Sequence, residues 1–371
     1  MNRILLLDID GVLVQPGGYR AALRASVQRF VGDFYIEESW LTEFEKRGIS
    51  SEWDMVPLLI ASYWDDVLAR QPMPDLPDDV FAAAGEIERR RKVEKPRRLI
   101  IPEFELLAGQ YPAQAALQAG CFPHIPARLR ERLLARTRDI QRSATMRTFQ
   151  HFTLGSETYT QTYALPAEFE TESLLLARDK PNLDKAARTQ IAQSGFPLAA
   201  FTARPSLPPR EVSAPGIGYA PEAEMALKLL GLQHLPLAAF GKLEYLASQH
   251  QLDPQTLVKP SPFHALAGCL AAWTRQELPS LQAAYTWFAA AAIDGLFGTL
   301  PRSFELVVIE DTLSGVRSAR AAGEILQKAG FEAVIRPLGL TNGVAAKASA
   351  FASAGVSHFD SWDELLAEID L

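Results

Sequence analysis

Residues 3–13 read Arg-Ile-Leu-Leu-Leu-Asp-Ile-Asp-Gly-Val-Leu, an apolar run that ends in two aspartates and a glycine. Three later segments have the same design, an apolar run that closes on polar residues, and they cover 196–202, 235–241 and 304–311. Continuous apolar runs are typical of strands that are covered on both faces, and helical patterns follow two of them, over 221–230 and 313–322. The sequence therefore predicts an α/β protein with a Rossmann-like parallel sheet. The strand ends should gather polar residues at one edge of that sheet.

The spacing of the strands predicts an inserted domain. Residues 9–195 separate the first two predicted strands, far more than the dozen or so that a simple crossover needs. We place a mainly helical domain at 15–179, with helices over 19–31 and 53–69, inside a core formed by 1–14 and 180–371. A smaller helical insertion in the core, rich in Ala and aromatic residues, is expected at about 276–301.

Composition narrows the class of protein. The chain has 371 residues, of which 48% are hydrophobic, and a formal net charge of −7. A negative chain does not present the basic field that drives nucleic-acid binding, so we expect no nucleic-acid partner. Its two cysteines show no metal-ligand spacing, and no apolar stretch reaches the roughly 18 residues that span a bilayer. We therefore expect a soluble cytoplasmic protein without a membrane partner, whose oligomeric state stays open.

One segment departs from this charge balance. Residues 86–147 hold 14 Lys or Arg against 7 Asp or Glu, a local charge of +7. Such a segment can steer an anionic substrate, but alternating Arg and Leu over 128–138 also fits the solvated face of an ordinary amphipathic helix. The sequence leaves both interpretations open.

The chemistry begins with Asp8-Ile9-Asp10-Gly11, directly after the first predicted strand. An aspartate can attack phosphorus to form an aspartyl phosphate, which splits one difficult displacement into two easier ones. The neighbouring aspartate can then protonate the leaving oxygen and deprotonate water. The same letters also occur in calcium loops and in turns, so this stretch alone does not decide the function.

Two further strand ends offer groups that suit a phosphoryl substrate. Thr202 ends the second predicted strand and Arg204 follows it, so a hydroxyl and a guanidinium fork can bind phosphate oxygens there. Lys259 precedes a predicted helix and can neutralise both a carboxylate and a phosphoryl group. The alternatives are a helix cap for Thr202 and a solvated surface position for Lys259.

Glu310 and Asp311 are adjacent acids at the end of the fourth predicted strand. Hard oxygen ligands of this kind suit Mg²⁺, although acids at the start of a helix also act as caps. Adjacent acids at the end of a buried strand are costly without a bound cation, which favours the metal.

These four stretches, in this order, resemble the motifs of the haloacid dehalogenase superfamily of phosphatases and phosphotransferases. Asp8 and Asp10 match its first motif, Thr202 its second, Lys259 its third, and Glu310-Asp311 its fourth in the Glu-Asp-x-x-x-Gly-Val form. The form of the fourth motif resembles subfamily I, and an insertion between the first and second motifs implies a C1 cap. Residues 17–20, 51–54 and 149–163 resemble an uncharacterised branch of subfamily IA phosphatases. The resemblance covers about 1–14 and 180–371, with weaker similarity at 17–20, 51–54 and 149–163, and the stretch of about 72–146 has no recognised counterpart.

The resemblance implies roles for these residues. Asp8 would be the nucleophile and Asp10 the general acid and base, while Thr202 and Lys259 would hold the phosphoryl group. Mg²⁺ would be held by Asp8, the Asp10 carbonyl, Asp311 and Glu310. The expected reaction is Mg²⁺-dependent hydrolysis of a small phosphorylated metabolite, with Arg204 and the cap residues Arg20, Tyr19 and Trp53 as candidate substrate contacts.

Two other functions remain open at this point. A phosphomutase uses the same four motifs and returns the phosphoryl group to a sugar. A non-catalytic binding protein can keep the fold after losing the reaction, although the complete set of motif residues argues against it. The identity of the substrate is not readable from the sequence.

Overall fold

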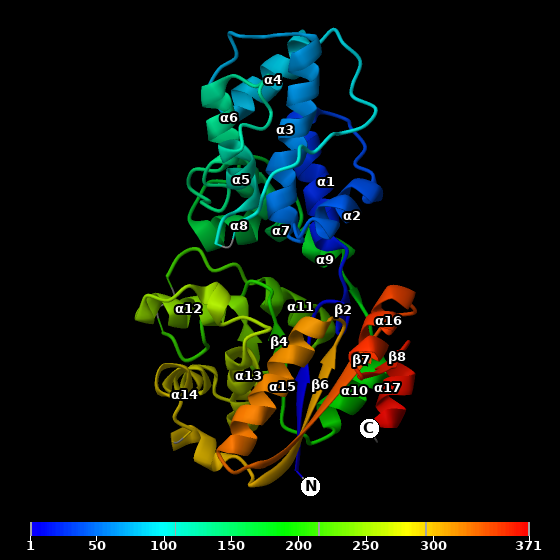
Figure 1. Ribbon diagram of the computed structural model, residues 1–371, viewed down its shortest axis with the longest axis vertical. Coiled ribbons are helices and arrows are strands. Elements are labelled where there is room, and N and C mark those ends of the chain that lie inside the picture. The colour runs from blue at the N-terminus through cyan, green and yellow to red at the C-terminus, as the bar shows by residue number, and fades with distance from the viewer. Residues whose placement is uncertain (1, 108, 214–215, 294, 370–371) are drawn as a thin grey trace. The chain divides into compact units, whose positions relative to one another are not determined.

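The computed structural model describes residues 2–107, 109–213, 216–293 and 295–369. The chain divides into two compact units, one formed by residues 1–16 and 179–371 and the other by residues 17–178 (Figure 1). Each unit buries hydrophobic residues of its own, so each is described by itself.

The first unit is built on a six-stranded sheet in which every neighbouring pair is parallel. In spatial order the strands are β5 (Leu237–Ala239), β4 (Leu198–Thr202), β1 (Asn2–Leu7), β6 (Ser303–Glu310), β7 (Glu332–Leu340) and β8 (Ser357–Phe359). The predicted α/β class with a parallel sheet is confirmed. The strand β7 was not among the strands that the apolar runs predict.

Helices cover both faces of this sheet. Successive side chains of a strand point to opposite faces, so a continuous apolar strand has apolar side chains to bury on both. Ile4 and Leu6 of β1 belong to one buried cluster, and Leu5 and Leu7 belong to another. The first cluster is completed by α12 (Phe240–His250), α13 (Pro262–Thr274), α14 (Glu277–Ala290) and α15 (Leu313–Lys328). The second is completed by α10 (Lys185–Gln193), α11 (Glu222–Leu230) and α17 (Trp362–Glu368) (Figure 1). Each fully buried Leu or Ile stabilises the unit by roughly 1.5–3 kcal/mol before the cost of ordering the chain.

Shorter elements complete the first unit. The region predicted as a helical insertion at 276–301 contains α14 and the 3₁₀ turn η2 (Gly295–Thr299), and its Leu281 and Phe297 are buried in the sheet's core. The 3₁₀ turn η1 (Pro254–Thr256) follows α12, and α16 (Ala345–Ser353) lies between β7 and β8.

The strand order places the candidate site. β1 lies between β4 and β6, with Leu7 paired to Ala200 on one side and to Ile309 on the other. The chain order reverses about β1, and in open parallel sheets ligands bind beyond the carboxyl ends of strands at such a point. Asp8, Thr202 and Glu310 therefore end neighbouring strands.

A short two-stranded sheet holds the points where the chain leaves and re-enters this unit. β2 (Val14–Gln15) pairs antiparallel with β3 (Lys180–Pro181), and the Asn182 N–H donates to the Leu13 carbonyl. The segment that leaves the first unit and the segment that returns to it are therefore joined by main-chain hydrogen bonds.

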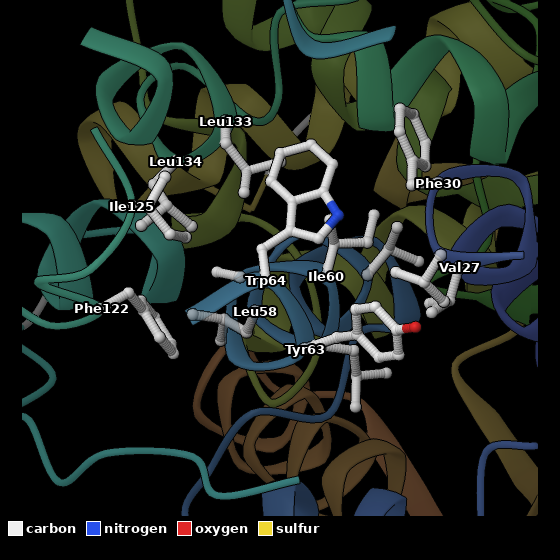
Figure 2. Packing of buried hydrophobic residues seen from close by; sticks show 14 of the residues in the cluster. Val27, Phe30, Leu58, Ile60, Tyr63, Trp64, Phe122, Ile125, Leu133 and Leu134 are labelled. Carbon is white, nitrogen blue, oxygen red and sulfur yellow. The ribbon is translucent and has the colours of Figure 1, made fainter. Parts of the chain in front are cut away.

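The second unit is helical across the residues that the structure describes. Its helices are α1 (Gly18–Val31), α2 (Glu38–Lys46), α3 (Glu52–Arg70), α4 (Val80–Arg90), α5 (Pro112–Gln118), α6 (Ala127–Leu134), α7 (Ala144–Leu154), α8 (Ser156–Tyr163) and α9 (Leu174–Arg178). The middle of α3 is buried on all sides, and Figure 2 shows its Trp64 and Tyr63 among residues of α1 and α6. A large hydrophobic cluster thus surrounds α3 in this unit.

Among the described residues, none of the helices combines the length and the apolar character needed to cross a bilayer.

Candidate active site

Asp8 occupies the first position beyond β1 and is buried. Its Oδ1 accepts a hydrogen bond from the Ile9 N–H at 2.8 Å. The chain then turns at Gly11, which has a φ of +70° and donates its N–H to the Val14 carbonyl. Only glycine adopts this φ without strain, so the Asp-x-Asp-Gly stretch forms a tight turn at the strand end.

Lys259 joins two of the predicted acids. Its Nζ lies 2.9 Å from Asp8 Oδ2 and 2.7 Å from Glu310 Oε1, and it also donates to the Phe201 carbonyl at 3.2 Å. All three charged side chains are almost completely buried. Two carboxyl groups and one ammonium therefore interact in a place where water does not screen them.

Burial and charge shift the ionisation of this cluster. Burial raises the pKa of Asp8 to about 6, the Lys259 ammonium works in the opposite direction, and the nearby carboxylate of Asp311 adds to the rise. Burial also raises the pKa of Glu310 well above its usual range. Burial alone would lower the pKa of Lys259, but the carboxylates of Asp8 and Glu310 outweigh it and raise that pKa. The lysine therefore stays charged.

His264, on the first turn of α13, holds the Lys259 segment in place. Its Nδ1 accepts the Lys259 main-chain N–H at 3.1 Å, so its Nε2 carries the proton and donates to the Ala238 carbonyl at 2.8 Å. Burial lowers the pKa of His264 to about 3, which keeps the ring neutral in this role. Sequence reasoning did not find His264.

Asp311 lies beside the Gly11 turn. A Cβ at Gly11 would lie 2.2 Å from Asp311 Oδ2, so the turn and the carboxylate approach closely only because residue 11 is glycine. The same oxygen accepts a hydrogen bond from Lys347 Nζ at 2.6 Å. Lys347 lies on α16, in a segment with no recognisable motif, and sequence reasoning missed it.

Three of the predicted metal ligands lie together. Asp8, Glu310 and Asp311 each offer a carboxylate oxygen within 4.8 Å of the others. Asp8 and Glu310 each accept two hydrogen bonds or ion-pair contacts, from Lys259 and the Ile9 N–H for Asp8 and from Lys259 and the Thr312 hydroxyl for Glu310. The fourth predicted ligand is the main-chain carbonyl of Asp10, and the side-chain carboxylate of that residue lies against Arg204.

The second predicted motif joins the same edge of the sheet. Thr202 is buried at the end of β4, and its Oγ1 accepts the Arg204 N–H at 3.2 Å. Arg204 reaches back to Asp10 and also contacts Asp179. The structure thus brings together all the predicted site residues that belong to the sheet unit.

Gly315 allows the helix α15 to approach Glu310. A Cβ at Gly315 would lie 1.8 Å from Glu310 Oε1, the oxygen that binds Lys259. We expect Gly315→Ala to lower the free energy of unfolding by about 1–3 kcal/mol, because Glu310 must move. Gly298→Ala is the matched control, since a Cβ there meets nothing within 4 Å, and its effect should stay within about 0.5 kcal/mol. Urea unfolding followed by circular dichroism measures both, and equal effects would contradict this packing.

The three cap-side candidates lie in the helical unit. Arg20 forms ion pairs with three carboxylates, those of Glu38, Glu45 and Glu52. Tyr19 and Trp53 are partly buried against the hydrophobic cluster of that unit, and the Arg138 guanidinium lies 4.7 Å from the centre of a Trp53 ring. These contacts give Arg20 and Trp53 roles within their own unit, and their part in substrate binding stays a prediction.

Half of the 14 basic residues in the segment 86–147 form ion pairs with other residues that the structure describes. Seven of its arginines lie within ion-pair distance of carboxylates in the same unit, namely Arg89, Arg90, Arg91, Arg128, Arg138, Arg142 and Arg147. This pairing favours the interpretation of 86–147 as charged helix surface over that of a substrate-steering patch.

Comparison with other proteins supports the fold. No protein-family model and no curated protein matches the sequence. A crystal structure determined by the Northeast Structural Genomics Consortium is similar over 100% of this chain and 98% of that chain, with a TM-score of 0.66 and 15% sequence identity. A haloacid dehalogenase-like protein of unknown function from Agrobacterium tumefaciens aligns over the same shares, with a TM-score of 0.39 and 15% identity. Fold and site together define a parallel α/β protein with a helical insertion and a carboxylate–lysine cluster at the carboxyl edge of its sheet.

Proposed function

We propose that this protein is a Mg²⁺-dependent phosphatase of the haloacid dehalogenase superfamily, which hydrolyses a small phosphomonoester through an aspartyl phosphate on Asp8. The observation that carries the proposal is the cluster at the sheet edge, where Asp8 contacts Lys259 and lies within 4.8 Å of both Glu310 and Asp311. A subfamily IA assignment and a cap role for residues 17–178 follow from the resemblance and belong to the same proposal.

Four side chains of the sheet unit have separate roles in the proposed reaction. Asp8 is the nucleophile, and its main-chain and Lys259 contacts hold the carboxylate in one orientation. Lys259 offsets negative charge as phosphorus is attacked, and the Thr202 hydroxyl binds a phosphoryl oxygen. Asp10 first gives a proton to the leaving oxygen and then takes a proton from water.

The acidic group fits Mg²⁺. Three carboxylates, those of Asp8, Glu310 and Asp311, provide the hard oxygen ligands that this ion prefers. The Asp10 carbonyl completes the set that the resemblance implies. When bound, Mg²⁺ neutralises charge on the phosphoryl oxygens.

A substrate screen tests the function. The purified protein is incubated with a panel of phosphomonoesters in Mg²⁺ or in EDTA, and free phosphate is measured. We expect release that depends on Mg²⁺. Isomerised sugar phosphate without net phosphate release would instead identify a phosphomutase. Absence of both products across the panel would favour a binding protein.

Mg²⁺ is also expected to stabilise the fold. Binding to the native state alone raises the free energy of unfolding by about 2.7 kcal/mol when the free ion is at 100 times its dissociation constant. Thermal unfolding with Mg²⁺ and with EDTA measures this effect without any turnover. Asp311→Asn should remove most of the shift, and an unchanged shift in that variant would contradict the assignment of Asp311 as a ligand.

A further inference from the structure

Arg204 binds Asp10 through two parallel hydrogen bonds. Its Nε lies 2.8 Å from Asp10 Oδ2 and its Nη2 lies 2.6 Å from Asp10 Oδ1. Such a bidentate pair fixes the plane of the carboxylate as well as its distance. Arg204 follows β4 and Asp10 follows β1, so the pair links the ends of two neighbouring strands.

Asp179 holds Arg204 from a second direction. The Arg204 Nη2 also donates to Asp179 Oδ2 at 2.8 Å, and the side chains of both residues are 2% exposed. Asp179 is the first residue of the sheet unit after the helical unit ends. The guanidinium therefore has little rotational freedom.

These contacts give Arg204 a different role from the substrate contact that the sequence suggests. A guanidinium carries one positive charge and only donates hydrogen bonds, and here it already serves two carboxylates. The Nε and Nη2 groups that make these contacts are not available to a phosphate. The contacts instead make Asp10 the group that Arg204 acts on.

We propose that Arg204, anchored by Asp179, is a positioning residue that orients Asp10 for proton transfer. This inference rests on the proposed phosphatase function. In the first half-reaction the Asp8 oxygen bonds to phosphorus, the bond from phosphorus to the ester oxygen breaks, and acidic Asp10 gives its proton to that oxygen. In the second, Asp10 takes a proton from water while the water oxygen bonds to phosphorus and the Asp8 oxygen leaves.

Asp10 accepts both hydrogen bonds from Arg204, so the pair fixes the direction in which its two oxygens face.

The leaving group of the substrate provides the test. Para-nitrophenyl phosphate expels an acidic phenol that needs little protonation, whereas phenyl phosphate depends more on a proton donor. We expect Arg204→Lys to lower kcat for phenyl phosphate roughly 10- to 100-fold and kcat for para-nitrophenyl phosphate less than about threefold, with KM nearly unchanged. Asp10→Asn is the reference and should show the same selectivity more strongly.

Two more variants complete the design. Asp179→Asn should also lower kcat more for phenyl phosphate than for para-nitrophenyl phosphate, but to a smaller degree. This variant replaces Arg204→Lys in the test if Arg204→Lys does not fold. Arg3→Lys is the matched control, because Arg3 pairs with Glu305 at 2.7 Å near the amino end of β1, far from Asp8 along the strand. It should leave both rates within about twofold of wild type.

The outcomes separate the two claims. Equal losses of kcat for both esters in Arg204→Lys would overturn the positioning role of Arg204 and indicate a purely structural role. A rise in KM alone would overturn it in favour of substrate binding. Absence of phosphate release from either ester by the wild-type protein would overturn the proposed function and this inference with it.

Discussion

Asp8→Asn is expected to abolish Mg²⁺-dependent phosphate release, with kcat lowered at least about 10⁴-fold. The amide keeps the shape of the side chain but is not a nucleophile toward phosphorus. It also removes a negative charge from a cluster in which Lys259 faces two acids, so the variant should fold. Phosphate release from the best ester of the screen measures the loss.

The control for this variant is Asp363→Asn, an exposed aspartate in the first turn of α17. It should keep wild-type turnover. Circular dichroism of Asp8→Asn should match the wild-type spectrum. Turnover by Asp8→Asn at more than a few per cent of wild type would remove Asp8 from the role of nucleophile.

Lys259→Met is expected to destabilise the sheet unit strongly. The substitution keeps an unbranched side chain but leaves Asp8 and Glu310 buried and facing each other without the ammonium between them. Removing one partner from a buried ion pair typically costs about 3–5 kcal/mol, because the remaining charge is left uncompensated. Urea unfolding, with the transitions of the two units fitted separately, measures the change.

Lys347→Met provides the comparison. Its ion pair with Asp311 is partly exposed, with the lysine side chain 31% accessible, so its loss should cost no more than about 1 kcal/mol. Equal destabilisation by the two variants would show that the burial of the Lys259 cluster does not set its energetic weight.

Much of the fold was predictable because the central strands are buried on both faces. β1, β4 and β6 read as continuous apolar runs for that reason. β7 lies next to the edge strand β8, and its exposed Glu332 and Val334 and the internal Pro337 break the run that would have marked it. Local sequence therefore predicted the strands that read as continuous apolar runs, the edge strand β5 among them, and missed β7.

The candidate site shows the same division. Asp8, Lys259, Glu310 and Asp311 stand at strand ends or within short motifs, so sequence alone predicts that they gather. His264 and Lys347 hold Lys259 and Asp311, Asp179 holds Arg204, and no motif marks these three residues. Their contacts join positions far apart in the chain, such as Asp311 and Lys347, and only the folded structure reveals such pairing.

The role of Arg204 shows a further limit. The sequence shows an arginine two positions after Thr202, the threonine predicted to bind phosphate, which suggests a substrate contact. The structure pairs Arg204 with Asp10, 194 positions away, and with Asp179. Residue type and local position indicate the charge of a group but not which partner it serves.

Chemical trapping of the covalent intermediate tests the central claim most directly. Borohydride reduces an acyl phosphate to an alcohol, so protein quenched with borohydride during turnover should carry homoserine in place of aspartate at position 8. Peptide mass spectrometry locates the change, and protein without substrate supplies the blank. We expect homoserine at position 8 only when substrate and Mg²⁺ are both present. Unmodified Asp8 in protein that is releasing phosphate, or homoserine at another position, would contradict the account.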